Sequence, residues 1–243
     1  MKKINSLVLA TAILAGITLA PAATLAAENY DSNGMITFAP NGDPTDPKDP
    51  LDPANPGTPI DPTDPAGPKP GTAGPLSIDY ASSLDFGIQK ITSQTMVYKA
   101  GAQNYSDENG TAKVGPNYVQ ITDNRGTEDG WTLQMKQNGQ FATAQSEELT
   151  GAAVTFKNGN VVTASTSTSP TGQATITADP SGAYQDVMSA KDGEGAGTYL
   201  LDWGTNATDA ADSIELSVPG ATTKYAKQYL TTFTWTLTDT PGN

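Results

Sequence analysis

From Leu76 to the C-terminus, apolar and polar residues alternate in short runs that are separated by turn residues. Alternation with a period of two places the apolar side chains on one face of a strand, whereas a helix needs a period of 3.6. The one candidate helix covers 184–190. Thr and Val, which favour strands, are frequent in the runs. The pattern predicts that residues 76–243 form an all-β domain, either an antiparallel β-sandwich or a Greek-key barrel.

Two Asn-Gly pairs, at 138–139 and 158–159, each lie between two strand-like runs. Asn-Gly favours the two-residue turn of a tight β-hairpin. The sequence therefore predicts two hairpins, which join 131–137 to 140–144 and 152–157 to 160–164.

A further strand-like run, Gly34 to Phe38, lies far upstream of the others. A single strand is not stable alone. We therefore expect residues 28–39 to add a strand to the sheet of the main domain. Residues 40–75 would then be a long Pro/Asp-rich excursion inside that domain.

In this excursion a proline occupies every third position from Pro44 to Pro68, and aspartates precede many of them. Polyproline II has three residues per turn, and the aspartates repel one another, so the segment is predicted to be disordered or extended. At ~3.1 Å per residue an extended form would span on the order of 80 Å. A spacer is the favoured interpretation, and a Pro-rich ligand is the alternative.

The N-terminus has the pattern of a secretory signal peptide. Lys2 and Lys3 precede an apolar run at 7–19, and small residues follow at 22–27. The run is shorter than the ~20 residues that a membrane-spanning helix needs. We expect residues 1–27 to be removed on export, which leaves a secreted chain without a membrane span.

Charge and composition exclude several functions. Without Lys2 and Lys3 the chain has 11 basic and 26 acidic residues, a net charge of -15. Binding to nucleic acid needs a basic surface, so nucleic acid is not a predicted partner. The chain contains no Cys and no His, which excludes disulfides, thiol and imidazole catalysis, and zinc-thiolate sites.

Two strand-like runs share a Trp-x-Leu pattern. Trp131 and Leu133 fall on one face of the first, and Trp235 and Leu237 fall on one face of the second, with polar residues opposite. An apolar face of this kind packs in a core more often than it binds a ligand.

The two Trp-x-Leu motifs, the second near the C-terminus, resemble the WxL domain of Gram-positive surface proteins. Further similar segments are 74–78, then Asp85, Phe86 and Gly87 in 84–87, and the run 119–130, which contains Asp123, Arg125 and Gly126. The resemblance covers about residues 30–240. It implies that Trp131, Leu133, Trp235 and Leu237 are the cell-wall-binding motifs.

The resemblance also implies a function. Proteins of this family are held non-covalently on peptidoglycan at the cell surface, often together with other surface proteins. The C-terminal residues 238–243 show no sorting motif, so we expect a folded surface to hold the chain on the wall. The alternative function is an adhesin, or a component of a multi-protein surface complex that binds a protein ligand.

Catalytic and metal sites are not predicted, and neither is a cofactor. Carboxylates for glycoside hydrolysis are present, but no motif places two of them together. Asp123, Asn124, Glu128 and Asp129 depart from the spacing of an EF-hand, so a solvated turn is favoured over a Ca²⁺ site. Within this turn, Asp123 and Arg125 are expected to pair and to fix the entry into the Trp131 strand. The carboxylates considered for catalysis are Glu147, Glu148, Glu194 and Glu215.

Overall fold

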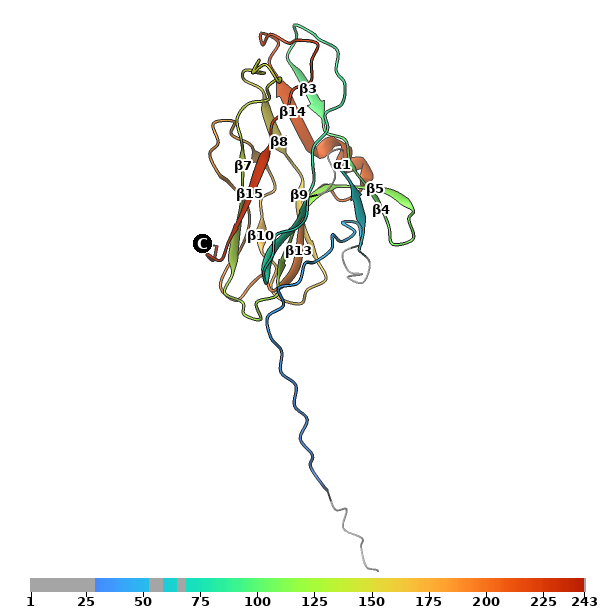
Figure 1. Cartoon of the computed structure of the whole chain (residues 1–243), viewed down its shortest axis with the longest axis vertical. Coiled ribbons are helices and arrows are strands. Elements are labelled where there is room, and N and C mark those ends of the chain that lie inside the picture. The colour runs from blue at the N-terminus through green and yellow to red at the C-terminus, as the bar shows by residue number, and fades with distance from the viewer. Residues whose placement is uncertain (1–28, 53–58, 65–68, 243) are drawn as a thin grey trace, which may run out of the picture. The chain divides into compact units, whose positions relative to one another are not determined.

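The computed structural model describes residues 29–52, 59–64 and 69–242 (Figure 1). The predicted signal peptide at 1–27 lies outside them. The chain divides after Thr37 into two units. Residues 29–37 of the first unit contain no strand, and Met35 is 97% exposed. The strand predicted at 34–38 is therefore not formed, because no neighbouring strand pairs with it.

The second unit contains four antiparallel sheets. The β6 sheet has the order β2 (Leu76–Ala81), β6 (Asn117–Asp123), β13 (Gly197–Trp203) and β9 (Gly159–Thr163). The β7 sheet has the order β10 (Thr171–Gly172), β12 (Gln185–Ala190), β7 (Trp131–Gln137) and β15 (Phe233–Thr238). The β8 sheet has the order β11 (Ile176–Thr177), β8 (Ala153–Phe156), β14 (Ile214–Val218) and β3 (Met96–Lys99). The small β4 sheet has the order β1 (Asp61–Thr63), β4 (Gln103–Ser106) and β5 (Ala112–Gly115), and one helix, α1 (Ala207–Ser213), is described.

The predicted all-β class is confirmed as mainly β, with 39% strand and 3% helix. All strand pairs are antiparallel. Each sheet keeps two edge strands, so hydrogen bonding closes no barrel within the described part of the chain. The sandwich arrangement stays a prediction.

The three larger sheets share one hydrophobic core. Its centre is aromatic: the ring of Trp203 lies 4.8 Å from that of Phe156 and 6.0 Å from that of Trp235. Each of these three residues comes from a different sheet, so the contacts join the sheets. The alternation seen in the sequence is the cause, because it gives each strand one apolar face.

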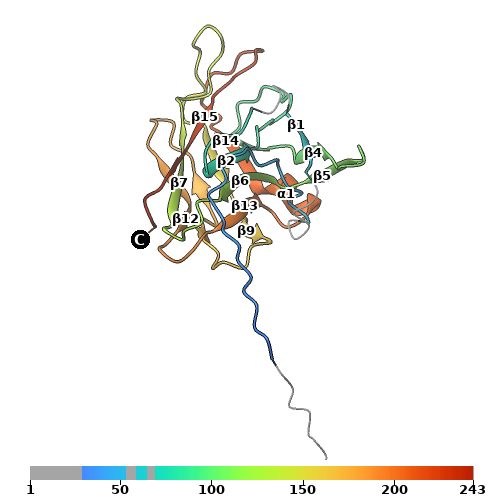
Figure 2. The same cartoon turned by 60° about the horizontal axis from the view of Figure 1, so that its bottom comes forward.

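Strand β6 is buried on both faces. Val119 and Ile121 belong to the main core, whereas Tyr118 belongs to a second cluster with Ile60 and Tyr105, and Gln120 accepts a hydrogen bond from the Asp/Pro-rich segment. The β4 sheet lies beside the β6 sheet (Figure 2). A strand that is covered on both sides loses the exposed polar face of a surface strand.

The Asp/Pro-rich segment is folded onto the domain in its described parts, which we call the strap (residues 45–52 and 59–64). Ile60 is 6% exposed, the Lys48 amide donates a hydrogen bond to the Gln120 side chain at 2.8 Å, and β1 pairs with β4. The prediction of a disordered or extended polyproline segment at 40–75 is wrong for these residues. The proline period gave no indication that Ile60 and Asp49 are buried.

Both predicted hairpins are wrong. Strands β8 and β9 flank Asn158-Gly159 but belong to different sheets. Asn158 has a positive φ of 56°, as a turn requires, and the turn leads the chain from one sheet to the next. Strand β7 pairs with β12 and β15, and residues 140–144 form only two isolated bridges, both at Ala142.

The candidate helix at 184–190 is also wrong, because these residues form β12. A register shift between Asp186 and Met188 interrupts the alternation and hides the strand in the sequence. The helix α1 was missed. Its signal was Asn206, whose side chain accepts hydrogen bonds from the amides of Thr208 and Asp209 as an N-cap.

Candidate functional site

The two Trp-x-Leu strands lie side by side in the β7 sheet (Figure 1). Trp235 of β15 is opposite Met135 of β7, and Leu237 is opposite Leu133. The two motifs therefore lie in one layer of the fold. The pairing joins residues about a hundred positions apart in the chain.

Trp131 is a core residue. Its side chain is fully buried, and its ring lies 6.4 Å from that of Tyr199. The indole nitrogen donates a hydrogen bond to the Gly195 carbonyl at 3.0 Å. Gly195 has a φ of 82°, and a Cβ atom there would lie 2.7 Å from the indole nitrogen. Trp131 is therefore locked in place, with no ring face open to a ligand, and Leu133 beside it is equally buried.

Trp235 and Leu237 are partly buried and pack against the same core. Because β15 is an edge strand, these side chains are covered less fully than those of β7. Trp235 contacts Trp203 at 6.0 Å between ring centroids, so its indole also has a packing partner. The apolar faces of both motifs are part of the core.

The opposite face of the same strands is polar. We define the polar face as Thr132, Gln134 and Lys136 of β7, Thr234 and Thr236 of β15, and Tyr184 and Asp186 on the β12 side. Gln134 donates a hydrogen bond to Asp186 at 2.8 Å. The Lys136 ammonium lies 5.1 Å from the ring centre of Tyr184, whose side chain is 46% exposed. Hydroxyls, an amide, a carboxylate and an open ring are thus presented together.

The Asp123 loop joins β6 to β7 and fixes the entry into β7. Arg125 donates two hydrogen bonds to the Asp123 carboxylate, at 3.0 and 2.7 Å, and a third to the Gly130 carbonyl at 2.7 Å. The bond to Asp123 raises the pKa of the Arg125 guanidinium. The predicted pairing of these side chains is confirmed. Gly126, at the tip of the loop, has a φ of 77°.

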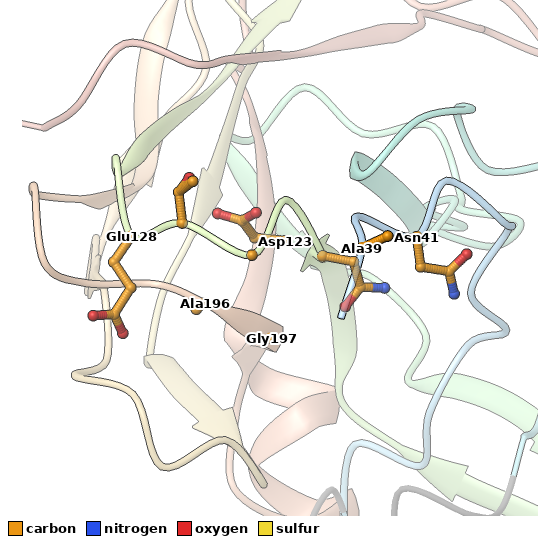
Figure 3. Close-up of a pocket in the computed structure, with 9 residues that line it drawn as sticks. Ala39, Asn41, Asp123, Glu128, Ala196 and Gly197 are labelled. Carbon is orange, nitrogen blue, oxygen red and sulfur yellow. The ribbon is translucent and has the colours of Figure 1, made fainter. Parts of the chain in front are cut away.

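A pocket of about 650 Å³ opens beside this loop (Figure 3). Glu128 lies on one side of it and Asn41 on the other, with Ala196 and Gly197 between them. Ser167 donates a hydrogen bond to the Glu128 carboxylate at 2.6 Å. The pocket combines carboxylate and amide groups with small residues, so it can accept hydrogen bonds from hydroxyls or amines.

Asp85, Phe86 and Gly87 form a turn that is anchored in the core. The Asp85 carboxylate accepts a hydrogen bond from the Gly87 amide at 2.8 Å, and Gly87 has a φ of 68°. The Phe86 ring packs edge-on against Phe141 at 6.1 Å. These contacts fix the conformation of the segment and hold it against the core.

The glutamates considered for catalysis are held apart in ion pairs and turns. Glu147 pairs with Lys227, which lowers the pKa of its carboxyl group. Glu215 pairs with Lys157 and Lys99, with the same effect on its pKa. Glu194 accepts a hydrogen bond from the Lys191 amide. Among the residues that the structure describes, no group of three or more acidic side chains could hold a metal ion, and no helix is long and apolar enough to span a membrane.

Sequence reasoning missed two features. Tyr184 was placed in a helix, so its position beside Lys136 on the polar face was not foreseen. Asp49, Asp79 and Asp202 were not singled out, although all three are buried where the strap covers the β6 sheet. The one indication of them in the sequence is their position. Asp79 and Asp202 interrupt the apolar pattern of their strands, at positions where a surface residue is expected.

These observations define a class of protein: a mainly β domain, built around a core that two paired Trp-x-Leu strands help to form. The chain belongs to the WxL domain surface cell wall-binding family, whose model matches residues 25–241. Comparisons with curated proteins and with solved structures gave no match. The family places the protein at the cell surface, in association with the cell wall.

Proposed function

We propose that the chain attaches non-covalently to peptidoglycan and acts by binding, without catalysis. The family match over residues 25–241 is the observation that carries this proposal. The ion pairing of Glu147 and Glu215 supports the non-catalytic part, because a glycosidase needs two free carboxyl groups that face one substrate.

We assign wall contact to the polar face rather than to the tryptophan rings. Trp131 is fully buried, so its ring is used in packing. The other side of the same strands presents Gln134, Thr236 and Asp186, which match the hydroxyl groups of a glycan chain. The exposed ring of Tyr184 offers a flat surface for stacking on a sugar.

The pocket beside the Asp123 loop is a second contact within this proposal. The loop that lines the pocket runs directly into β7, the strand that carries part of the polar face. The Glu128 carboxylate can accept hydrogen bonds from amines or hydroxyls, both of which peptidoglycan presents.

The test is sedimentation with washed, protein-free cell walls. The mature chain is expected to pellet with the walls, and Tyr184→Ala is expected to reduce the bound fraction severalfold without a change in melting temperature. Thr155→Ala is a control, because Thr155 lies on the polar face of the β8 sheet, where its hydroxyl hydrogen-bonds to that of Thr177 at 3.4 Å. It should bind like the unmodified protein.

The two parts of the proposal fail separately. If the unmodified chain stays in the supernatant, wall binding is wrong. If the chain pellets and Tyr184→Ala and Glu128→Gln both pellet equally well, wall binding stands but the assigned surface is wrong.

An adhesin or complex-forming role is the second candidate function. It is favoured by Ile88 and Ile91, which are exposed in one loop, and by Val97 on the edge strand that follows. Apolar side chains of this kind suit a protein surface better than a hydrated polymer. This function predicts stronger binding to walls that retain their proteins, with the difference lost in the Ile88→Ser/Ile91→Ser double variant.

A further inference from the structure

The strap covers a buried group of acidic and phenolic side chains that wall binding does not use. Asp49 of the strap is 7% exposed, and Asp202 of β13 is 1% exposed. Tyr80 of β2, Tyr105 of β4 and Tyr118 of β6 form the hydrophobic cluster around them, together with Ile60. Two carboxyl groups from distant parts of the chain are thus enclosed in one apolar layer.

The two carboxyl groups differ in their hydrogen-bond partners. Asp49 accepts hydrogen bonds from the Tyr105 hydroxyl at 2.7 Å and the Leu51 amide at 2.9 Å, and it pairs with Lys113 at 3.3 Å. Within the described residues, Oδ1 of Asp202 and the hydroxyl of Tyr118 have no hydrogen-bond partner. A buried carboxylate without a partner is costly, and protonation removes most of that cost.

The surrounding charges favour the protonated form of Asp202. Burial raises the pKa of its carboxyl group well above the usual range, and the Asp49 carboxylate of the strap raises it further. Lys113 of β5 is shared between Asp49 and Asp107, and Lys48 of the strap acts on Asp79 of β2. The Tyr105 and Tyr118 hydroxyls are neutral groups, because burial raises the pKa of each.

The pKa of Asp79 is shifted in the same direction as that of Asp202, but the Asp79 carboxylate has more hydrogen-bond donors. Burial raises the pKa of its carboxyl group, while hydrogen bonds from Thr122, Ser77 and Gln120 oppose the rise. Three donors stabilise its charged form, whereas no hydrogen bond from another described residue reaches Oδ1 of Asp202. Asp202 is therefore the group whose ionisation costs most while the strap is in place.

We propose that the strap is a pH-sensitive cover, which stays on the β6 sheet while Asp202 is protonated and is released as Asp202 ionises. This goes beyond wall attachment, because it regulates which surface of the β6 sheet is open. The described strap is held by contacts outside the main core: the three residue pairs of β1 with β4, Ile60, the bonds of Lys48 and Asp49, and hydrogen bonds from the Gln120 and Gln103 side chains to the Asp46 and Thr63 carbonyls. It can thus open while the main core stays folded.

The sign of the effect follows from proton linkage. With the strap in place Asp202 keeps a proton that it loses to water when the strap opens. The equilibrium constant for closing therefore falls as pH rises above about 4, by up to tenfold per pH unit, until the enclosed carboxyl group itself ionises. Low pH closes the strap, and high pH opens it.

Hydrogen exchange of the full mature chain between pH 5 and pH 8 tests this. The amide of Lys48 reports directly, because its bond to the Gln120 side chain joins the strap to β6. After correction for intrinsic exchange, its protection is expected to fall severalfold or more per pH unit. Asp202→Asn should remove this fall, whereas Asp192→Asn, a change at an exposed acid, should preserve it.

A second measurement uses the unmodified chain, so it does not depend on whether a variant folds. The ¹³C shift of the Asp202 carboxyl group in the unmodified chain should titrate well above the usual carboxyl range, together with the loss of strap protection. The proposal is overturned if Asp202 is already ionised at pH 5 while the strap is protected. Protection that does not change with pH, or that still changes in Asp202→Asn, also contradicts it.

Discussion

The two tryptophans of the Trp-x-Leu motifs are buried to different extents. Trp131 is enclosed in the core, while Trp235 is only partly covered, because β7 is a central strand and β15 an edge strand. The same difference separates Leu133 from Leu237. The motif residues pack in or against the core, and the polar side chains between them face outward.

We predict that Trp131→Ala lowers the free energy of unfolding by about 3 to 5 kcal/mol, because it leaves a large cavity in a closed core. Denaturant unfolding measures this change. Wall binding, counted per folded molecule, should be unaltered, which is the opposite of the behaviour expected for Tyr184→Ala. A Trp131→Ala protein that is folded, stable and unable to pellet with walls would favour direct stacking instead.

A second prediction concerns the Asp123 loop. Arg125→Ala leaves the buried Asp123 carboxylate without its guanidinium partner, so the free energy of unfolding should fall by about 2 to 3 kcal/mol. The double variant Asp123→Asn/Arg125→Ala should recover part of this loss, since it has no unpaired charge. Equal stability of the single and double variants would show that the charge itself is unimportant.

At the scale of elements, the sequence predicted strands well and their partners poorly. The alternation in 131–137 and 233–238 located β7 and β15 closely, since each buries one face. Asn138 and Asn158 were turn residues as expected, yet neither turn makes a hairpin. Turn chemistry is local, whereas the choice of partner strand depends on which apolar faces meet in the core.

The strap and the site were harder to predict for the same reason. From its composition, the segment 40–75 was predicted to be solvated chain. Only the tertiary contacts of Ile60 and Asp49 show that the strap packs against the domain. The pairing of Asp123 with Arg125 was predictable, because the two lie two positions apart. The polar face was not, because it gathers residues from three strands.

The strap supplies the third prediction. Ile60→Ala should lower the free energy of unfolding, or of strap closure, by about 2 to 4 kcal/mol, because Ile60 fills the cluster with Tyr80 and Tyr118. Thermal unfolding and exchange at the Lys48 amide separate the two cases. Ile91→Ala, at a residue that is 58% exposed, is the matched control and should change stability by less than about 0.5 kcal/mol.

For the whole molecule, net charge governs the approach to the wall. The chain with residues 1–27 removed has 11 basic and 26 acidic residues. Two lysines of the described loops are engaged within the domain, since Lys224 donates to the Pro219 carbonyl and Lys227 pairs with Glu147. With more than twice as many acidic as basic residues, the chain is not expected to attract an anionic polymer through its net charge.

The fourth prediction follows from this charge. Raising monovalent salt from 0.05 to 0.5 M, over which the Debye length falls below about 10 Å, should leave wall binding unchanged or strengthen it by screening repulsion. Sedimentation with protein-free walls at several salt concentrations measures the effect. A steep loss of binding with salt would contradict it and indicate a local cationic contact.

The pairing of β7 with β15 has a consequence for how the protein reaches its destination. The core needs Trp235 and Leu237 of β15, which pair with β7 residues about a hundred positions earlier in the chain. A chain that crosses a membrane in extended form from its N-terminus cannot complete this core until β15 has also crossed, because contacts between distant residues form late. In a chain exported in this way, the fold is completed only outside the membrane, on the side of the wall.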